Sequence, residues 1–361
     1  MKIETGPRNA LTDVAGLLVG HHQALDAEVT RGTGAATGCT VVRAPGGATA
    51  AVDVRGGGPG TRETDLLDPH NTVRRVDAIL LTGGSAYGLA AADGVMRWLE
   101  EHGQGIPMDP ADPAKIVPIV SGAVIFDLPL GAWDIRPTAE FGYRAADAAG
   151  PEVARGCVGA GTGAQAGVLK GGIGTASIHI LDGPAAGCTV AALATVNAAG
   201  ATFDPRTGLP WGVGSDGADH FGLRSATSEQ LARAAALPPK GASLNTTIGV
   251  VATDAELEPG EAERLAMSAH DGLSRAVRPA HTPLDGDCFF ALATGARVLD
   301  PEAYGPKTPL ARTLRVADLC AAAALATERA IVDGLLSAHT VAGIPSYTDV
   351  FGDRAVDRAG R

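Results

Sequence analysis

The chain has 361 residues, of which 45% are hydrophobic and 19% are charged, so it can bury the core of one large domain or two small ones. Its net charge of −11 and its 4% aromatic content exclude the basic, base-stacking surface typical of a nucleic-acid-binding protein. No apolar run reaches the ~20 residues of a membrane span, and the N-terminal apolar stretch is too short for a secretion signal. We therefore expect a cytoplasmic protein with neither a nucleic-acid nor a membrane partner.

Cysteines and histidines show no pattern that indicates a metal or a disulfide framework. The cysteines are scattered and odd in number, at Cys39, Cys157, Cys188, Cys288 and Cys320. None of them forms a CxxC pair, and the nine histidines lack metal-ligand spacing. We expect free thiols, no metal and no cofactor.

The first part of the chain alternates strand-like runs with glycine clusters. Short β-branched or apolar runs lie at 39–43, 49–54 and 78–82, and the last of them ends in Gly83–Gly84. From Ser85 to about Glu101 the apolar residues change to helical spacing. The pattern predicts a buried strand that leads through a glycine turn into a helix, whose first backbone amides can bind an anion or an oxyanion.

The middle of the chain contains further elements around a second glycine cluster. A strand is predicted over 116–126 and a short helix near 138–149. After the glycine cluster at 156–174, residues 188–196 are apolar enough for a central strand.

Residues 203–240 are the least periodic part of the chain, apart from a helical fragment at 228–236. We interpret this segment as an exposed linker. It is followed by a β-branched run that begins near Thr246 and is typical of a buried strand.

The C-terminal part predicts helices that alternate with one strand. Pro259 opens a helix, Asp285–Gly286 makes a turn, and a strand covers 288–293. An alanine-rich helix is predicted from about Leu314 to Ser337. Strands and helices occur in clusters, so a layered α/β sandwich fits the pattern best.

A threonine at the start of a strand, directly after a linker, suits an unusual kind of catalysis. The Thr246 hydroxyl can attack the preceding Asn245 carbonyl, and hydrolysis of the resulting ester leaves threonine as a new N-terminus. Its α-amine has a reference pKa of ~7.7–8.0 and can act as the base for its own hydroxyl. Taken alone the signal is weak, because a β-branched residue at a strand start is more often structural.

Two carboxylates downstream strengthen this interpretation. Asp285 and Asp287 flank a glycine and can accept hydrogen bonds from a nearby hydroxyl or ammonium group. The same Asp-Gly pair is also typical of an ordinary hairpin turn, and the residues alone favour that alternative.

Four motifs occur in a fixed order along the chain: Thr12-Asp13-Val14, the GGSAYG stretch at 83–88, Asn245-Thr246-Thr247 and Asp285-Gly286-Asp287. Together they resemble the DmpA/NylC family of self-processing N-terminal-nucleophile hydrolases, over about residues 11–332. The resemblance implies an αββα sandwich of the type shared with ornithine acetyltransferases. It also implies one hydrolase domain, 1–361, that cleaves itself into 1–245 and 246–361.

The family includes aminopeptidases that act on short peptides, D- and β-amino-acid peptides among them, and hydrolases of 6-aminohexanoate oligomers. Around the nucleophile this sequence more closely resembles the second group, because threonine follows asparagine and the DGD motif is present. The resemblance implies a small peptide or amide-oligomer substrate and a homo-oligomer, a tetramer.

The resemblance also implies roles for five residues. Thr246 is the nucleophile, and Asp285 and Asp287 orient it. Lys170 matches an active-site lysine and Asn197 an asparagine of the oxyanion site, roles that suit a cation and an amide donor. Without the family, a surface charge and a turn residue are the simpler interpretations of Lys170 and Asn197.

One position departs from the family pattern. Where a tyrosine is common, in a stretch that reads Ser121-Gly-Ala-Val-Ile-Phe-Asp127 here, this chain has Phe126. The phenolic hydroxyl is therefore missing from a substrate-binding position, which affects rate and specificity more than the nucleophile. We interpret Asp127 as structural.

Three alternatives remain. Gly159–Ala164 with Asp182 formally matches a dinucleotide-binding fingerprint, but neither a preceding strand nor a long following helix is predicted. An amino-acid N-acetyltransferase of similar fold differs only in the group that attacks the acyl-enzyme. A non-catalytic homologue is suggested by Phe126, while Thr246 and the DGD motif oppose it.

Overall fold

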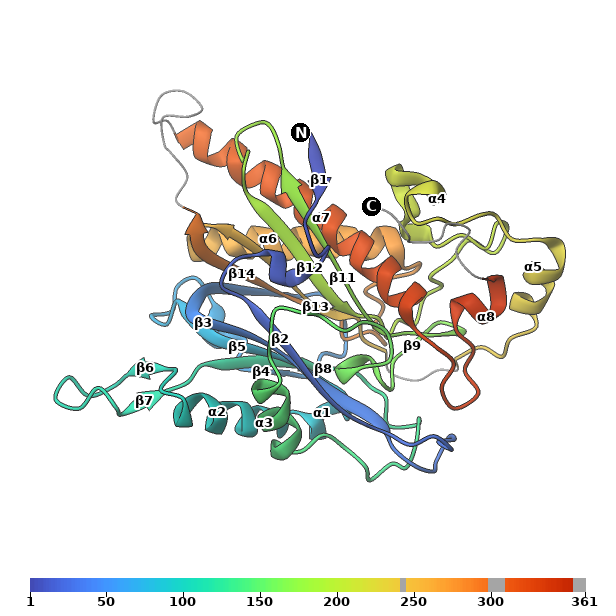
Figure 1. The fold of residues 1–361 in the computed structure, drawn as a ribbon, viewed down its shortest axis with the longest axis horizontal. Helices are drawn as coiled ribbons and strands as arrows, with labels where there is room; N and C mark the ends of the chain where they lie inside the picture. Colours follow the sequence, from blue (N-terminus) through green and yellow to red (C-terminus); the bar gives the residue numbers. More distant parts are fainter. Residues whose placement is uncertain (241–244, 298–308, 353–361) are drawn as a thin grey trace.

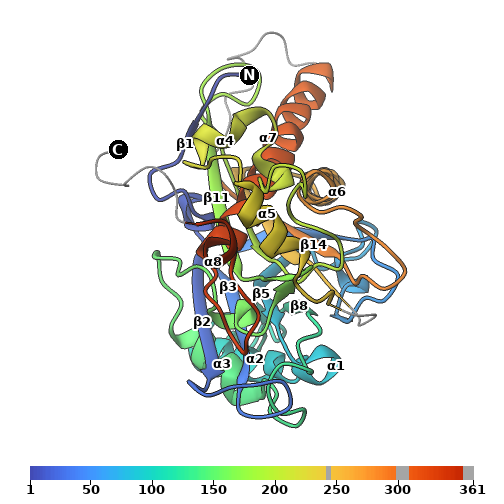
Figure 2. The ribbon, with the colours of Figure 1, turned by 90° about the vertical axis from the view of Figure 1, so that its right-hand side faces the viewer.

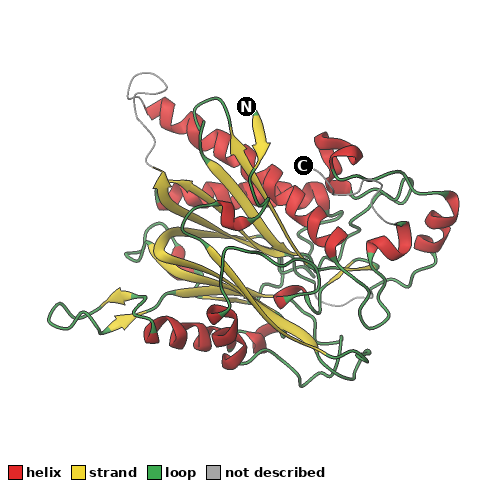
Figure 3. Ribbon diagram, in the orientation of Figure 1, coloured by secondary structure: helices red, strands yellow, loops and turns green. Residues whose placement is uncertain are grey.

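The computed structural model describes residues 1–240, 245–297 and 309–352, and it stacks them as helix, sheet, sheet and helix (Figures 1 and 3). Helices α6 (Pro259–Ala276) and α7 (Pro309–Ser337) cover one outer face. Helices α2 (Ala91–Glu101) and α3 (Ala139–Asp147) cover the other. The expectation of a layered αββα sandwich is confirmed.

The first sheet layer contains β1 (Ile3–Thr5), β11 (Ile173–Ile180), β12 (Thr189–Thr195), β13 (Ile248–Ala255) and β14 (Cys288–Arg297), in that order. The second contains β2 (Leu18–Leu25), β5 (Arg75–Thr82), β8 (Val120–Val124) and β4 (Thr61–Arg62). The strand β3 (Ala36–Val54) joins the two layers.

Strand β3 belongs to both layers because it turns a corner in its middle. Its residues 39–43 pair with β5, and its residues 49–54 pair with β14. The register shifts between Arg43 and Ala48, around an exposed Pro45 that carries no N–H to donate. The two strand-like runs predicted at 39–43 and 49–54 are thus two halves of one strand.

The side chains between the two layers form a dry core. Ile79 and Leu81 from β5 lie in one cluster with Leu193, Val250 and Phe290 from the first layer. All five are fully buried. Because side chains alternate along a strand, the other faces of the same strands pack against the helices, and this doubles the apolar area that each strand buries.

The remaining elements of the described residues are short: β6 (Ile106–Pro107), β7 (Ile116–Val117), β9 (Gln165–Ala166), β10 (Leu169–Lys170), α1 (Ser85–Gly88), α4 (Gly217–His220), α5 (Ser228–Ala235), α8 (Tyr347–Phe351) and the 3-10 helices 11–13, 65–67, 159–161 and 211–216. Although α7 is long, no helix of the described residues is both long and apolar enough to cross a membrane.

Three sequence predictions need correction. The helix predicted from Ser85 to Glu101 is divided into α1 and α2, and the strand predicted over 116–126 is divided into β7 and β8. The segment 203–240 is not an exposed linker, because Phe203, Leu223 and Ala234 are buried in the core that α6 and α7 cover. Figure 2 shows its helix α5 beside α8, a contact that anchors the segment to the C-terminal part of the chain.

The unit β13–α6–β14 positions the candidate nucleophile. Strands β13 and β14 are parallel, in a register that pairs Ile248 with Cys288 and continues as a bridge between Asn245 and Asp285. Parallel strands begin at the same edge of a sheet. Residues that precede β13 therefore lie beside residues that precede β14, and the hairpin interpretation of Asp285–Gly286 is wrong.

Candidate active site

The Asn245–Thr246 peptide bond is buried and bound on both sides by backbone groups. The Thr246 N–H donates to the Asn197 carbonyl at 2.8 Å, and the Gly286 N–H donates to the Asn245 carbonyl at 2.8 Å. The Thr246 hydroxyl donates to the same Asn245 oxygen at 2.5 Å. The hydroxyl thus lies next to the carbonyl that it would attack, and that carbonyl already has a backbone donor of the kind that stabilises an oxyanion.

The two predicted carboxylates lie at this bond but bind different groups. Asp285 accepts the Thr282 N–H at 2.8 Å, while one oxygen of Asp287 accepts the Thr247 N–H at 2.8 Å. Both side chains are buried, with 2% exposure each, in a site where a carboxylate without such donors would be costly. Asp287 therefore connects the DGD turn directly to the residue after the candidate nucleophile.

A histidine that sequence reasoning dismissed completes the hydrogen bonding of Asp287. The second Asp287 oxygen accepts the His281 backbone N–H at 3.0 Å and faces the His281 Nδ1 at 2.9 Å. His281 adopts a left-handed backbone with φ of 57°. Only the folded turn brings it to Asp287, so spacing in the sequence gave no signal for it.

The glycine-rich stretch after β3 lines the DGD turn from outside. The Gly58 N–H donates to the Asp285 carbonyl at 2.8 Å. A side chain at Gly56 would come within 2.4 Å of that carbonyl, and one at Gly286 would come within 2.8 Å of the Thr246 hydroxyl. This close approach explains why glycines occupy both positions. The RGGGPG sequence at 55–60 was a detectable signal that the sequence analysis did not use.

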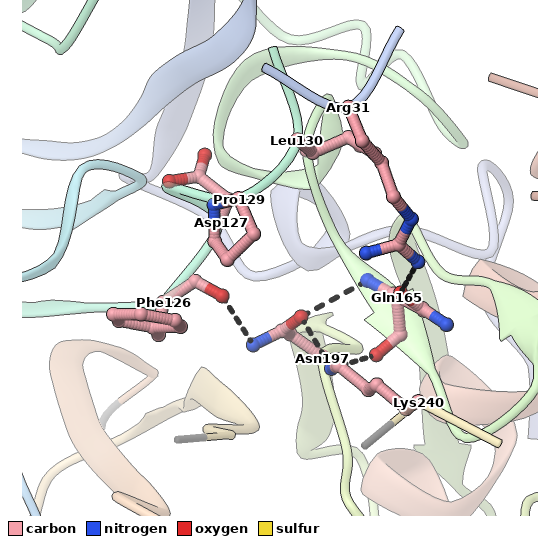
Figure 4. Close-up of a pocket in the computed structure, with 9 residues that line it drawn as sticks. Arg31, Phe126, Asp127, Pro129, Leu130, Gln165, Asn197 and Lys240 are labelled. Atoms are coloured by element: carbon pink, nitrogen blue, oxygen red, sulfur yellow. Dashed lines mark hydrogen bonds between the residues drawn. The ribbon is translucent and has the colours of Figure 1, made fainter. Parts of the chain in front are cut away.

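Asn197 contacts the peptide bond and also lines a small cavity of about 100 Å³, which Figure 4 shows. Its backbone carbonyl binds Thr246, whereas its side chain faces the cavity. The side-chain oxygen accepts the Gln165 N–H at 2.9 Å, and Nδ2 donates to the Phe126 carbonyl at 3.4 Å. Among the residues that the structure describes, the Nδ2 group makes only that long contact, which a developing oxyanion could replace.

A second lysine, Lys240, which sequence reasoning missed, lines this cavity. The Lys240 ammonium donates to the Asn197 side-chain oxygen at 2.9 Å and to the Gln165 carbonyl. Arg31 donates to the Gln165 side-chain oxygen at 3.2 Å, from the opposite wall. From the sequence alone, a lysine at the end of a polar segment is expected to be exposed to solvent. Only the fold shows that the Lys240 ammonium binds Asn197 and Gln165.

Lys170, the predicted active-site lysine, is fully buried in the glycine-rich loop. Its ammonium donates to the carbonyls of Gly161, Ala164 and Gly171 at 3.0, 2.6 and 2.7 Å. Loss of hydration lowers its pKa from the ordinary value. Backbone carbonyls accept all three hydrogen bonds of the ammonium, and these contacts hold the loop that precedes β11. The interpretation of Lys170 as a solvated charge is therefore wrong.

Phe126 and Asp127 line the same cavity. The Phe126 ring makes an edge contact with Trp133, with centroids 6.3 Å apart. Asp127 accepts the Gly84 N–H at 2.6 Å and the Thr37 hydroxyl at 2.7 Å, and burial raises its pKa to about 6. The Gly84 amide of the predicted glycine turn therefore binds an internal carboxylate, and the Gly83 amide binds the Gly38 carbonyl.

The dinucleotide alternative does not fit the local structure. Gly159–Gly161 forms a 3-10 turn that no strand precedes, and the short strand β9 follows it instead of a long helix. Within residues 1–240, 245–297 and 309–352, no group of three or more metal-ligating side chains is close enough to hold a metal ion. All five cysteines are free thiols, and only Cys320 is not fully buried.

Comparisons with known proteins identify the family of this chain. The sequence matches peptidase family S58 over residues 9–348. An uncharacterised aminopeptidase of Mycobacterium tuberculosis is 57% identical over 95% of this chain and 98% of its own length. A 6-aminohexanoate-oligomer endohydrolase of a Kocuria species is 30% identical over 60% of each chain.

A solved structure extends the likeness to the fold. The L-aminopeptidase D-Ala-esterase/amidase of Ochrobactrum anthropi, described as a variant of the Ntn hydrolase fold, matches with a TM-score of 0.67 and 24% identity. The match covers 99% of this chain and 93% of that one. These matches do not support the acetyltransferase alternative. The chain belongs to peptidase family S58, has the N-terminal-nucleophile hydrolase fold, and is a hydrolase of peptide or amide bonds.

Proposed function

We propose that this protein is a self-processing amide hydrolase whose nucleophile is Thr246, released as a new N-terminus when the Asn245–Thr246 bond breaks. The observation that carries the proposal is the position of the Thr246 hydroxyl, 2.5 Å from the oxygen of the Asn245 carbonyl that also accepts the Gly286 N–H. Nucleophile, electrophile and oxyanion donor are adjacent before any bond breaks.

Self-cleavage proceeds through an ester. The Thr246 oxygen attacks the Asn245 carbonyl carbon, the C–N bond breaks, and the hydroxyl proton passes to the nitrogen, which becomes the Thr246 amine. Water then hydrolyses the ester and leaves a carboxylate on Asn245. The products are residues 1–245 and 246–361; of the second part, 298–308 and 353–361 lie outside the described residues.

In each later turnover the same hydroxyl attacks a substrate amide, the substrate C–N bond breaks, and water then hydrolyses the acyl ester and frees Thr246. The Thr246 amine takes the hydroxyl proton and delivers it to the leaving amine, and the Asn197 side chain and backbone N–H groups stabilise the oxyanion. Asp287 positions β13 through Thr247, and Asp285 supplies negative charge beside the new ammonium. Lys170 positions the glycine-rich loop next to Gln165.

The substrate class is an amide of a short peptide or of a peptide-like oligomer such as 6-aminohexanoate. The names of the Mycobacterium and Kocuria relatives support this class. Phe126 leaves the cavity without the phenolic hydroxyl common in the family, so its contribution to substrate binding is apolar. We also propose a homotetramer that acts in the cytoplasm.

Denaturing mass spectrometry of the purified protein tests the proposal. Two fragments that meet between Asn245 and Thr246 are expected, together with amide hydrolysis that follows their appearance. Thr246→Ala removes the hydroxyl and leaves one uncut chain, whereas Thr246→Ser keeps a hydroxyl and still cleaves. A wild-type chain that stays at 36.2 kDa under all conditions contradicts the mechanism.

A further inference from the structure

The cavity beside Asn197 contains a ligand supplied by the chain itself. The Lys240 ammonium is bound by two oxygen acceptors, the Gln165 carbonyl and the Asn197 side-chain oxygen (Figure 4). Lys240 precedes the Asn245–Thr246 bond by only a few residues, at the end of the segment 203–240. The cavity is therefore built to bind a primary ammonium, and in the uncut chain a lysine provides it.

Charges around the cavity act on the Lys240 ammonium in opposite directions. Asp285 and Asp127 attract it and raise its pKa, while Lys170 and Arg31 repel it. Loss of hydration is the largest effect, and the pKa of Lys240 ends well below the ordinary value. The lysine is thus costly to keep in the cavity, and another ammonium with a shorter, less flexible stem can replace it.

Asn197 connects this cavity to the bond that is cut. One residue binds Thr246 through its backbone carbonyl and the ammonium through its side-chain oxygen. Asn197 therefore links an ammonium in the cavity to the residue that carries the candidate nucleophile. Such a link suits a ligand in which a free amine is close to the amide carbonyl, as at the N-terminal residue of a peptide.

Cleavage gives a physical reason for Lys240 to leave. The new Asn245 carboxylate forms beside Asp285, which is 2% exposed and pairs with Asn245 across the sheet edge. Two carboxylates in a buried site repel each other strongly. Release of the new chain end would relieve this repulsion and would free Lys240 to leave the cavity.

Lys240 also borders two cavities. Its side chain lines the polar cavity and a second, mostly apolar cavity of about 510 Å³ between α5 and residues 199–205. With Lys240 absent, a ligand bound by its ammonium has adjacent apolar space for its side chain or for the rest of an oligomer.

We propose that Gln165 and Asn197 form a binding site for the primary ammonium of the amide substrate, and that Lys240 occupies this site until the chain is cut. The site then favours substrates with a free amine close to the scissile amide over substrates that are blocked at that amine. This inference rests on the proposed function, since it assigns a part of the same active site.

The test measures ligand binding in uncut protein, so that it does not depend on catalysis. Thr246→Ala provides the full-length background, and Lys240→Met in that background removes the ammonium but keeps an apolar stem. Titration calorimetry with alaninamide is expected to give a dissociation constant at least tenfold lower in the double variant than in Thr246→Ala alone. N-acetylalaninamide, which lacks the ammonium, is expected to bind neither protein.

Two controls make every outcome decisive. Lys115→Met removes an exposed lysine ammonium that contacts Asp109, and it should leave alaninamide binding unchanged. Lys240→Gln is measured alongside, because a neutral residue with N–H donors preserves folding if methionine does not. Equal alaninamide binding with and without Lys240, or equal binding of the acetylated compound, overturns the site. Self-cleavage of the wild type is scored separately, so failure of one proposal does not imply failure of the other.

Discussion

The two sides of Asn197 are built from different kinds of groups. On the side of the peptide bond, the contacts of Asn245 and Thr246 are made by the backbone of Asn197 and Gly286. On the side of the cavity, the Asn197 side-chain amide meets the Gln165 N–H, the Phe126 carbonyl and the Lys240 ammonium. We therefore expect self-cleavage to depend on how closely the backbone can approach, and substrate binding to depend also on the side chains of Asn197 and Lys240.

The first test of this difference replaces Gly286 with alanine. A Cβ there would lie 2.7 Å from the Gly58 carbonyl and 2.8 Å from the Thr246 hydroxyl, so the turn must shift and its N–H must leave the Asn245 carbonyl. Loss of one oxyanion donor typically costs ~10²–10³ in rate, and we expect Gly286→Ala to slow self-cleavage by about that factor. Fragment formation over time, followed by mass spectrometry, measures it.

A matched control for this substitution is Gly46→Ala, at a glycine whose added Cβ would contact nothing within 4 Å. It should cleave at the wild-type rate with an unchanged melting temperature. Normal cleavage in Gly286→Ala would show that the backbone donor is not needed.

A smaller effect is expected at Asn197, where one substitution distinguishes the backbone contact with Thr246 from the side-chain contacts in the cavity. Asn197→Ala keeps the backbone carbonyl that binds Thr246 but removes the amide in the cavity. Self-cleavage should slow by less than about tenfold, while kcat for amide hydrolysis by the processed enzyme should fall by about 10²-fold through loss of the side-chain donor. Equal losses in the two rates would argue that Asn197 acts through the fold alone.

The smallest effect concerns Asp127 and pH. Burial raises its pKa to about 6, so lowering the pH from 7.5 to 5 removes a negative charge from the cavity. The KM for an amine-bearing amide should then rise about fivefold to tenfold, whereas Asp127→Asn should show a high KM at both pH values. A wild-type KM that does not change with pH would exclude Asp127 from ammonium binding.

The pH dependence of the free energy of unfolding should be opposite to that of substrate binding, because Asp127 contributes to stability at low pH. Because the folded pKa of Asp127 lies above its ordinary value of 3.8, the folded protein binds more protons than the unfolded chain between these values. The contribution of Asp127 to stability is therefore present at low pH and lost as the pH rises through about 6. Thermal melts of Asp127→Asn should lack this component.

Regular elements could be predicted where the signal is local. The helix that begins at Pro259 and the central strand near 188–196 follow from periodicity and from apolar runs, and both are confirmed. Strand β11 gave no such signal, because its Thr175 and Ser177 are buried through hydrogen bonds to Leu11 and Asp13. Partners more than 160 positions away along the chain cannot be read from a local pattern.

The residues of the candidate site also divide into those that the sequence predicted and those that it did not. Thr246 and the DGD motif were recognised from the order of motifs, and the parallel strands β13 and β14 bring them together. Lys240 and His281 were missed because each is an ordinary polar residue until the fold places it against Asn197 or Asp287. Sequence reasoning therefore reached the residues at the bond and, through the family resemblance, Asn197 and Phe126 at the cavity, but not Lys240 or His281.

The placement of β13 and β14 has a consequence for the processed protein. Both strands follow the proposed cut, yet they are inserted between β12 and β3, which precede it. After cleavage the two polypeptides would share one sheet and would unfold together in a single cooperative transition. Their reassembly from denaturant would require an encounter between two molecules, so the refolding rate should depend on concentration, unlike that of the uncut Thr246→Ala chain.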